Sequence, residues 1–392
     1  MRIGIPREVK RQEYRVGLAP AAVARLAEAG HDVTVEAGAG ADVGFSDEQY
    51  LLAGAQVTSV DAVFDSELIV KVKEPQPVEW QRLRQDHVLF CYLHLAACPE
   101  LARYLVDAGV TAIACETVTD KDGSLPLLAP MSEIAGRMSI QVGAYALQCA
   151  SGGRGVLLSG ATGVMPASVV ILGGGVAGVN AARMALGLGA DVTIIEKAPA
   201  RLMRLRKRFG NRARVLSARP VLIEYGVRGA DLVVGAALVP GAAAPKLLSR
   251  ELVRSMRDGA VLVDICIDQG GCSETSRPTT HDAPTYVEEG VVHYCVTNMP
   301  GAVARTSTLA FNNVALPFVQ TLADKGWRTA LADDPCLARG LNVHAGRIRH
   351  PAVAEALGAG HRCRAGGGKP PPPPGRGEVS QGRAGAGGGG LG

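Results

Sequence analysis

Three ionisable side chains stand directly after apolar runs in the first 120 residues. Lys73 follows residues 68–72, His94 follows residues 88–93, and Glu116 follows residues 112–115. Ligands of open parallel sheets bind beyond the carboxyl ends of the strands, so these residues predict a shared polar pocket. Taken singly, each has an ordinary structural explanation: a surface lysine, an interior histidine with satisfied hydrogen bonds, and a loop carboxylate. Their common position favours the pocket, most of all for Lys73 and His94.

A second chemistry-bearing segment lies at residues 168–196, which read SVVILGGGVAGVNAARMALGLGADVTIIE. An apolar run leads into Gly173, Gly175 and Gly178 in the pattern GxGxxG, then a helical stretch, a second apolar run and Glu196. In a dinucleotide site the first glycine makes the turn, the second lets backbone approach a pyrophosphate and the third packs helix on strand. The helix N-terminus favours an anion. A glycine-rich turn of another α/β unit is the simpler alternative, but the complete order of elements favours a dinucleotide.

The acid at position 196 favours NAD over NADP, because a carboxylate there accepts hydrogen bonds from a ribose and repels a 2′-phosphate. Three nearby cations, Lys197, Arg201 and Arg204, weaken this preference. The basic run over residues 201–214 is interpreted as a solvated helix face. We therefore expect NAD.

The elements that must position these residues predict an α/β fold of two Rossmann-like, doubly wound domains with a cleft between them. Short apolar strands alternate with helical segments, which is typical of parallel sheets. The NAD-binding domain is predicted over residues 131–303. The substrate domain is predicted to be discontinuous, with residues 1–130 and 304–358, because a helical pattern over 306–325, expected to kink at Pro317, returns the chain to it.

Two further segments carry polar residues at their ends. Ser132 is expected to cap a helix that runs to about residue 148, with Glu133 in its first turn. A strand over residues 260–267 is expected to place Asp268 just past its end. Asp268 is therefore expected at the carboxyl end of a strand of the second sheet.

Composition excludes several classes of protein. The net charge of +4 comes from residues 361–392, and the Gly/Pro-rich bias of residues 359–392 predicts a disordered tail. No basic stripe for nucleic acid and no apolar run of membrane-spanning or signal-peptide length is present. Nine scattered cysteines without a CxxC pair predict reduced thiols in the cytoplasm. His94 and Cys98 have ligand-like spacing, but without a second pair we expect no zinc site.

Eight segments in unbroken order resemble the alanine dehydrogenase family, within the superfamily that includes the NAD-binding subunit of transhydrogenase. They are MRIGIPREVK with Arg15, KVKEP at 71–75, FCYLHLA at 90–96, APMSE at 129–133, GGGVAG, DICIDQGG at 264–271, RPTT at 277–280 and VTNMP at 296–300. The resemblance runs from Met1 to about Leu357. It implies reversible NAD-dependent oxidative deamination of L-alanine to pyruvate and ammonium, in a homohexamer.

The resemblance also implies roles for individual residues. Arg15 and Lys73 correspond to the residues that bind the substrate, and an arginine fork suits a carboxylate. His94 corresponds to the general acid/base, and Asp268 to the second polar catalytic group. The remaining cofactor contacts fall on Ser132, Val176, Ala177, Glu196, Arg201, Ala237, Leu238, Ile267, Asp268, Arg277, Asn298 and Met299.

The chain departs from the family pattern at several positions. Glu196 stands where many relatives have aspartate, and Ala218 stands where a serine helps to hold the adenosine, although Ser217 is adjacent. Thr321 and Lys325 replace a glutamate and a histidine that bind magnesium in some relatives, so we expect no metal. The tail also differs from the family ending, and its bias is that of a shifted high-GC reading frame or of a genuine extension.

Other functions remain open from the sequence. A transhydrogenase NAD-binding subunit would dock on a membrane partner and would not need Lys73 and His94 as a substrate pair. Saccharopine-type dehydrogenases share the architecture but need a pocket for a larger amino acid. A non-catalytic NAD-binding or regulatory protein is the alternative outside enzymes. The presence of Arg15, Lys73, His94 and Asp268 together favours the alanine dehydrogenase hypothesis.

Overall fold

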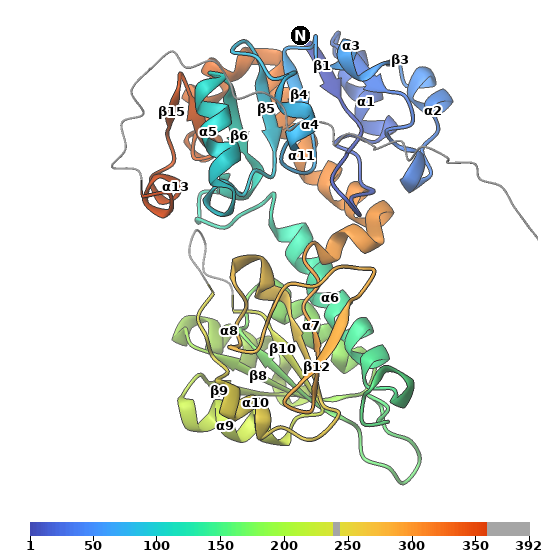
Figure 1. Cartoon of the computed structure of the whole chain (residues 1–392), viewed down its shortest axis with the longest axis vertical. Helices are drawn as coiled ribbons and strands as arrows, with labels where there is room; N and C mark the ends of the chain where they lie inside the picture. Colours follow the sequence, from blue (N-terminus) through green and yellow to red (C-terminus); the bar gives the residue numbers. More distant parts are fainter. Residues whose placement is uncertain (238–243, 359–392) are drawn as a thin grey trace, which may run out of the picture. The chain divides into compact units, whose positions relative to one another are not determined.

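The computed structural model describes residues 1–237 and 244–358, which form two sheets flanked by helices (Figure 1). The predicted tail, residues 359–392, lies outside this part of the chain. Within the described ranges, no helix combines the length and apolarity needed to cross a bilayer.

The first sheet has eight strands among the described residues, in the order β15-β14-β6-β5-β4-β1-β2-β3. Strands β1 to β6 pair in parallel, whereas β14 pairs antiparallel with both β6 and β15. The strands are β1 (Arg2–Ile5), β2 (Asp32–Glu36), β3 (Gln56–Thr58), β4 (Leu68–Val70), β5 (Val88–Cys91), β6 (Thr111–Ala114), β14 (Leu341–His344) and β15 (Arg347–Ile348). The helices of the same two chain segments are α1 (Pro20–Glu28), α2 (Asp47–Leu52), α3 (Val60–Val63), α4 (Pro77–Trp80), α5 (Pro99–Asp107), α11 (Ala304–Asp333), α12 (Pro335–Ala338) and α13 (Pro351–Ala356).

The second sheet has seven strands in the described part, in the order β12-β13-β11-β10-β7-β8-β9. All its pairs are parallel except β12 with β13. The strands are β7 (Ser168–Leu172), β8 (Asp191–Glu196), β9 (Ala213–Ser217), β10 (Leu232–Gly235), β11 (Val261–Asp264), β12 (Thr285–Glu288) and β13 (Val291–Tyr294). The helices are α6 (Ala129–Ala146), α7 (Val176–Gly187), α8 (Pro199–Phe209), α9 (Pro220–Gly229) and α10 (Arg250–Arg254).

Both sheets repeat one topology, which confirms the predicted fold class. Numbered along the chain, β1–β6 and likewise β7–β11 with β13 follow the order 3-2-1-4-5-6 of a dinucleotide-binding sheet. Strands β4, β5 and β6 are buried along their whole length, because helices cover both faces of a parallel sheet and the strands become continuously apolar. In each sheet the strand order reverses between the first and fourth strands, and ligands bind at this switch point.

The first sheet takes strands from two distant segments of the chain. Strands β14 and β15 follow the long helix α11 and join β6 at the edge of the sheet (Figure 1). A discontinuous substrate domain requires such a return of the chain. The exact boundaries near residues 130 and 303 stay a prediction.

Four details of the predicted elements were wrong. Ser132 does not cap a helix, because α6 already begins at Ala129 with Leu128 before it. The residue of α11 that leaves helical geometry is Gly326, with φ 71°, and not Pro317. Strand β11 ends at Asp264, so Asp268 lies within a 3-10 helix, Ile265–Gln269. The short strands β3, β12, β14 and β15 had not been predicted.

Candidate active site

The glycine-rich turn lies at the switch point of the second sheet. Strand β7 ends at Leu172 and helix α7 begins at Val176, with Gly175 immediately before it. Strand β7 lies between β8 and β10, which is where the strand order reverses. The free N–H groups at the start of α7 therefore face the place at which a pyrophosphate binds in this fold.

The surroundings of the three glycines match their expected separate roles. A Cβ at Gly173, where φ is 105°, would lie 2.5 Å from the carbonyl oxygen of Ala236. A Cβ at Gly178 would lie 1.9 Å from the carbonyl oxygen of Gly173, so only glycine allows the helix to pack on the turn. A Cβ at Gly175 would meet nothing within 4 Å. The open space at Gly175 is the cradle that a pyrophosphate requires, so the residues present fit a dinucleotide.

Glu196 is the last residue of β8, and its carboxylate binds the glycine turn. Its carboxylate accepts hydrogen bonds from the N–H groups of Gly174 and Ala198, both at 2.7 Å, and from Arg201 Nη1 at 3.2 Å. Burial alone would raise the pKa of Glu196, but these three donors outweigh it and lower the pKa. Glu196 is therefore an anion that ties the glycine turn to α8, and a ribose hydroxyl would share oxygens that already accept hydrogen bonds.

The other predicted cofactor residues lie on six segments. Val176 and Ala177 open α7, and Ala237 follows β10 beside Gly173. Ile267 and Asp268 belong to the 3-10 helix after β11, while Asn298 and Met299 follow β13. The guanidinium of Arg277 stacks 3.9 Å from the ring centroid of Tyr286. Ser132 lies in the first turn of α6, next to Met131, and Leu238 lies outside the described residues.

The predicted substrate residues follow the two strands at the switch point of the first sheet. Arg15 lies in the segment after β1, and Lys73 lies three residues past the end of β4. Strands β1 and β4 are paired neighbours, so both segments leave the same edge of the sheet. The first sheet thus presents a lysine and an arginine where the second sheet presents the glycine turn.

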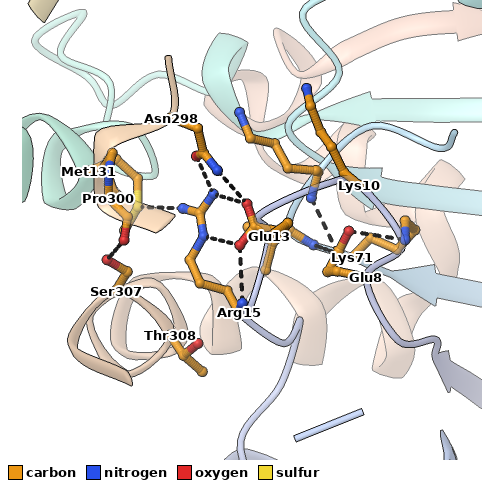
Figure 2. A network of polar contacts seen from close by, with 12 residues as sticks. Glu8, Lys10, Glu13, Arg15, Lys71, Met131, Asn298, Pro300, Ser307 and Thr308 are labelled. Atoms are coloured by element: carbon orange, nitrogen blue, oxygen red, sulfur yellow. Dashed lines mark hydrogen bonds and ion pairs between the residues drawn. The ribbon is translucent and has the colours of Figure 1, made fainter. Parts of the chain in front are cut away.

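Most of the hydrogen-bonding capacity of Arg15 is already used inside the protein (Figure 2). Its Nε and Nη2 donate to the two carboxylate oxygens of Glu13, each at 2.6 Å, and Nη2 also donates to Asn298 Oδ1 at 2.8 Å. Only Nη1 has a weak acceptor, the Sδ of Met131 at 3.1 Å. Burial would raise the pKa of Glu13, but the hydrogen bonds and charge of Arg15 prevail and lower it to about 2. The side that remains for a ligand is Nη1.

A buried ion cluster beneath Lys73 fixes its main chain. Glu8 Oε1 accepts hydrogen bonds from the N–H groups of Val72, at 2.6 Å, and Lys73, at 3.3 Å. The second Glu8 oxygen pairs with Lys71 Nζ at 3.2 Å, and Lys71 also pairs with Glu79 at 2.8 Å. The side chain of Lys73 itself is buried, and burial together with the charge of Arg15 lowers its pKa.

His94 follows β5 in an unusual backbone conformation. Its φ of 49° and ψ of 37° lie in the left-handed region, which is rare for a residue with a Cβ. Its Nδ1 lies 3.9 Å from Glu74 Oε2, and Glu74 also pairs with Lys10. Burial lowers the pKa of His94, since the opposing carboxylate of Glu116 only partly offsets burial and the Lys73 charge. A histidine whose pKa stays below its ordinary value is available as a neutral base near pH 7.

One small cavity of about 120 Å³ brings together three of the predicted residues, one from the first sheet and two from the second. Lys73, Asp268 and Asn298 line it, and Arg15 contacts it through Asn298. Asp268 is exposed, and its charge acts on both Lys73 and His94. Among the predicted residues, the cavity therefore combines a lysine, a carboxylate and an amide, whereas His94, Glu116 and Arg15 are not part of its described lining.

Sequence reasoning missed several residues of this site. The carboxylate of Glu13 binds Arg15, and the carboxylate of Glu74 faces His94. His281 lines the cavity, and its main-chain N–H donates a hydrogen bond to Gln12 Oε1 at 3.1 Å. His281 directly follows the RPTT segment at residues 277–280, and this position could have identified it as a site residue. For Glu13 and Glu74 the proximity along the chain to Arg15 and Lys73 was the only signal.

The described residues contain no group of three His, Cys, Asp or Glu side chains arranged to hold a metal ion. At the two positions where some relatives bind magnesium, Thr321 Oγ1 donates to the Pro317 carbonyl at 2.8 Å and Lys325 pairs with Asp333 at 2.7 Å. A lysine engaged in this way does not provide a cation ligand.

Comparisons with known proteins agree with this geometry. The family models "Alanine dehydrogenase/PNT, N-terminal domain" and "Alanine dehydrogenase/PNT, C-terminal domain" match residues 4–135 and 139–351. An alanine dehydrogenase of Halomonas elongata is 56% identical over 360 residues, covering 91% of this chain and 97% of its own. One of Mycolicibacterium smegmatis is 52% identical over 359 residues, covering 91% and 97%.

Solved structures give the same result. A structure of L-alanine dehydrogenase has 53% identity and a TM-score of 0.88, and the match covers 91% of this chain and 99% of that one. A transhydrogenase from Sinorhizobium meliloti has 24% identity and a TM-score of 0.78, and the match covers 89% and 100%. The second similarity concerns the fold alone.

Proposed function

Because the chain belongs to the alanine dehydrogenase/PNT family, we propose that it catalyses the reversible NAD-dependent oxidative deamination of L-alanine to pyruvate and ammonium. Relatives more than 50% identical over most of the chain are alanine dehydrogenases, which favours this activity over the transhydrogenase and saccharopine-type alternatives. The family is NAD-dependent, and the glycine cradle before α7 fits that cofactor.

Arg15 and Lys73 bind the substrate in this proposal. The carboxylate of alanine takes Arg15 Nη1, which otherwise meets only the Met131 sulfur, because Glu13 and Asn298 occupy the other donors. A buried arginine held by Glu13 is rigid, so binding the substrate sacrifices little side-chain freedom. Lys73 donates a hydrogen bond to the carbonyl oxygen of pyruvate in the reverse direction. Its buried main chain, bound to Glu8, holds the side-chain ammonium group of Lys73 in place.

His94 and Asp268 move protons during the reaction. A bound NAD would supply the acceptor for the hydride that leaves the Cα of alanine. The resulting imine carbon then takes up water, and His94 receives the proton of that water before the C–N bond breaks and ammonium leaves. His94 then returns this proton to the leaving nitrogen. Asp268, whose charge acts on Lys73 and His94, accepts the hydroxyl proton of the carbinolamine as the carbonyl of pyruvate forms.

The observation that carries this assignment is the meeting of Lys73 and Asp268 in one cavity, although they come from different sheets. The test replaces His94 by glutamine. Turnover should fall by at least about 100-fold, the size of a general acid–base contribution. NADH binding, followed by fluorescence titration, should stay within about twofold. Loss of NADH binding together with turnover would contradict the proposed role of His94.

We further infer a homo-oligomer, hexameric as the family resemblance implies. Four large apolar side chains near residues 145–165 are at least 64% exposed: Tyr145, Leu157, Val164 and Met165. Tyr145 and Leu157 line one open hollow, and the chain over residues 157–167 folds back on itself beside them. Exposed apolar patches of this kind are typical of interfaces. All cysteines in the described ranges are free, which supports a cytoplasmic location.

A further inference from the structure

Glu116 was singled out in the sequence but has no place in the roles assigned so far. It lies in a short 3-10 helix, Cys115–Thr117, directly after β6. Strands β5 and β6 are parallel neighbours, so the segment with Glu116 and the segment with His94 leave the same edge of the sheet.

The carboxylate of Glu116 binds the main chain of His94. Glu116 Oε1 accepts a hydrogen bond from the His94 N–H at 2.7 Å and from the Leu93 N–H at 3.2 Å. The second oxygen, Oε2, accepts from the Leu93 N–H at 3.1 Å. Two successive N–H groups are thus held by one anion, and hydrogen bonds to a charged acceptor are stronger than neutral ones.

These bonds stabilise a backbone that is unfavourable by itself. The left-handed conformation of His94 is strained for a residue with a Cβ and persists only where the surroundings enforce it. A different conformation at position 94 would move the imidazole relative to Lys73 and Asp268. The Glu116 carboxylate is the described group that accepts the His94 N–H, and so it determines the direction in which the imidazole leaves the chain.

We propose that Glu116 is a positioning residue for His94, which holds the imidazole in its reactive place through the main chain of residues 93 and 94. The proposal rests on the role of His94 in the proposed function.

Other charged groups around His94 determine what the removal of Glu116 would do. Glu74 faces the ring at Nδ1 and is paired with Lys10, while Lys73 and Asp268 act from across the cavity. His350, just before α13, lies near Glu116, and its Nδ1 is buried without a hydrogen-bond partner in the described structure. Among these groups Glu116 is the strongest that raises the pKa of His94, so its neutralisation lowers that pKa further.

The test compares Glu116→Gln with Glu116→Ala. Glutamine keeps a carbonyl oxygen as acceptor but removes the charge, whereas alanine removes both. For Glu116→Ala, kcat should fall by about 10- to 100-fold, because a misplacement of about 1 Å has an effect of that size. The KM for alanine and the affinity for NADH should change by less than about threefold, since neither Arg15 nor the glycine turn is touched. Glu116→Gln should recover most of kcat, and the acidic limb of its kcat/KM profile should move to lower pH.

Two controls separate the outcomes. Glu100→Gln removes an exposed carboxylate from the first turn of α5 and should change neither kcat nor the pH profile. His94→Gln is measured in parallel, and if it stays active the proposed function of His94 fails regardless of Glu116. If His94→Gln is inactive, but Glu116→Ala has the kcat of the unmodified chain, the positioning role is wrong. If Glu116→Ala does not fold, an unshifted pH profile in Glu116→Gln would equally show that the positioning role is wrong.

Discussion

At the scale of single residues, Arg15 shows how a site can be prepared before its ligand arrives. Glu13 and Asn298 use three of the donor positions of Arg15, and Asn298 Nδ2 donates in turn to Glu13 at 2.8 Å (Figure 2). Asn298 follows β13 of the second sheet, whereas Glu13 and Arg15 follow β1 of the first. A residue predicted to bind the cofactor is therefore hydrogen-bonded to one predicted to bind the substrate.

The Glu13–Arg15 pair predicts a pH dependence of folding stability. The pKa of Glu13 lies near 2 in the folded chain against 4.5 as its ordinary value, so the pair stabilises the fold above about pH 4.5 and this contribution is lost as the pH falls towards 2. Its full size is about 3 kcal/mol. The stability deficit of Glu13→Gln, measured by urea unfolding, should be largest at neutral pH and should narrow below pH 4.5.

The control for this measurement is Asp282→Asn, which breaks an exposed ion pair with Arg11. Exposed pairs contribute about 0–1 kcal/mol, so this variant should stay close to the unmodified chain throughout. A deficit of Glu13→Gln that is constant from pH 7 to pH 3 would contradict the assigned pair.

Residue types at strand ends made part of this site predictable. Lys73 and His94 each follow an apolar run, and the rule that ligands bind at the carboxyl ends of parallel strands needs no coordinates. The partner carboxylates were not predictable in the same way. Glu13 and Glu74 bond through side-chain rotamers, and the contact of Glu116 depends on β5 and β6 being neighbours, which a single sequence does not state.

At the scale of elements, the turn between β7 and α7 allows its glycines to be tested separately. Gly175→Ala should leave the melting temperature nearly unchanged, because its Cβ would meet no atom within 4 Å and its φ of −73° suits any residue. NADH affinity should fall by at least about tenfold, since the methyl group enters the space of the pyrophosphate.

Gly178→Ala should instead lower the stability of the folded chain. Its Cβ would lie 1.9 Å from the Gly173 carbonyl oxygen, so the helix must shift and stability should fall by about 1–3 kcal/mol. Gly187→Ala, at the exposed end of the same helix, is the matched control and should stabilise the chain by about 0.5–1 kcal/mol. Equal loss of stability at positions 175 and 178 in thermal melts would refute the assigned roles.

Elements with a strong pattern were predicted well, and short ones were not. Strand β1 and helices α1 and α7 have apolar faces bounded by proline or glycine, and these signals lie within the segment itself. Strands β14 and β15 have only four and two residues, and they form by pairing: β14 with the edge of β6, and β15 with β14. Gly326, with φ 71°, interrupts α11, whereas Pro317 lies inside the helix without leaving helical geometry.

At the scale of the whole molecule, the exposed apolar side chains near residues 145–165 predict assembly. Light scattering should give about six times the chain mass of 40.6 kDa. The double variant Leu157→Glu with Met165→Glu should shift this mass to smaller species, because each charge would have to be buried in an interface. Leu52→Glu alters a residue that is 88% exposed in another part of the chain and should leave the mass unchanged. A monomer in the unmodified protein would contradict the inferred oligomer.

The two-sheet architecture was predictable because each half repeats the same alternation of strands and helices. The repeated order 3-2-1-4-5-6 also explains why the site has two halves: one switch point presents the glycine turn, and the other presents Arg15 and Lys73. What the order of elements could not predict is which side chains meet, such as Asp268 with Lys73 in one cavity.

The most direct measurement is NADH formation by the purified chain with L-alanine and NAD at alkaline pH, followed by absorbance. D-alanine, NADP and other amino acids serve as controls. We expect NADH formation with L-alanine and NAD, and little or no turnover of D-alanine. Little or no NADPH should form with NADP, because the anionic Glu196 would repel a 2′-phosphate. Binding of NADH without any turnover of L-alanine would contradict it and would favour a non-catalytic NAD-binding protein.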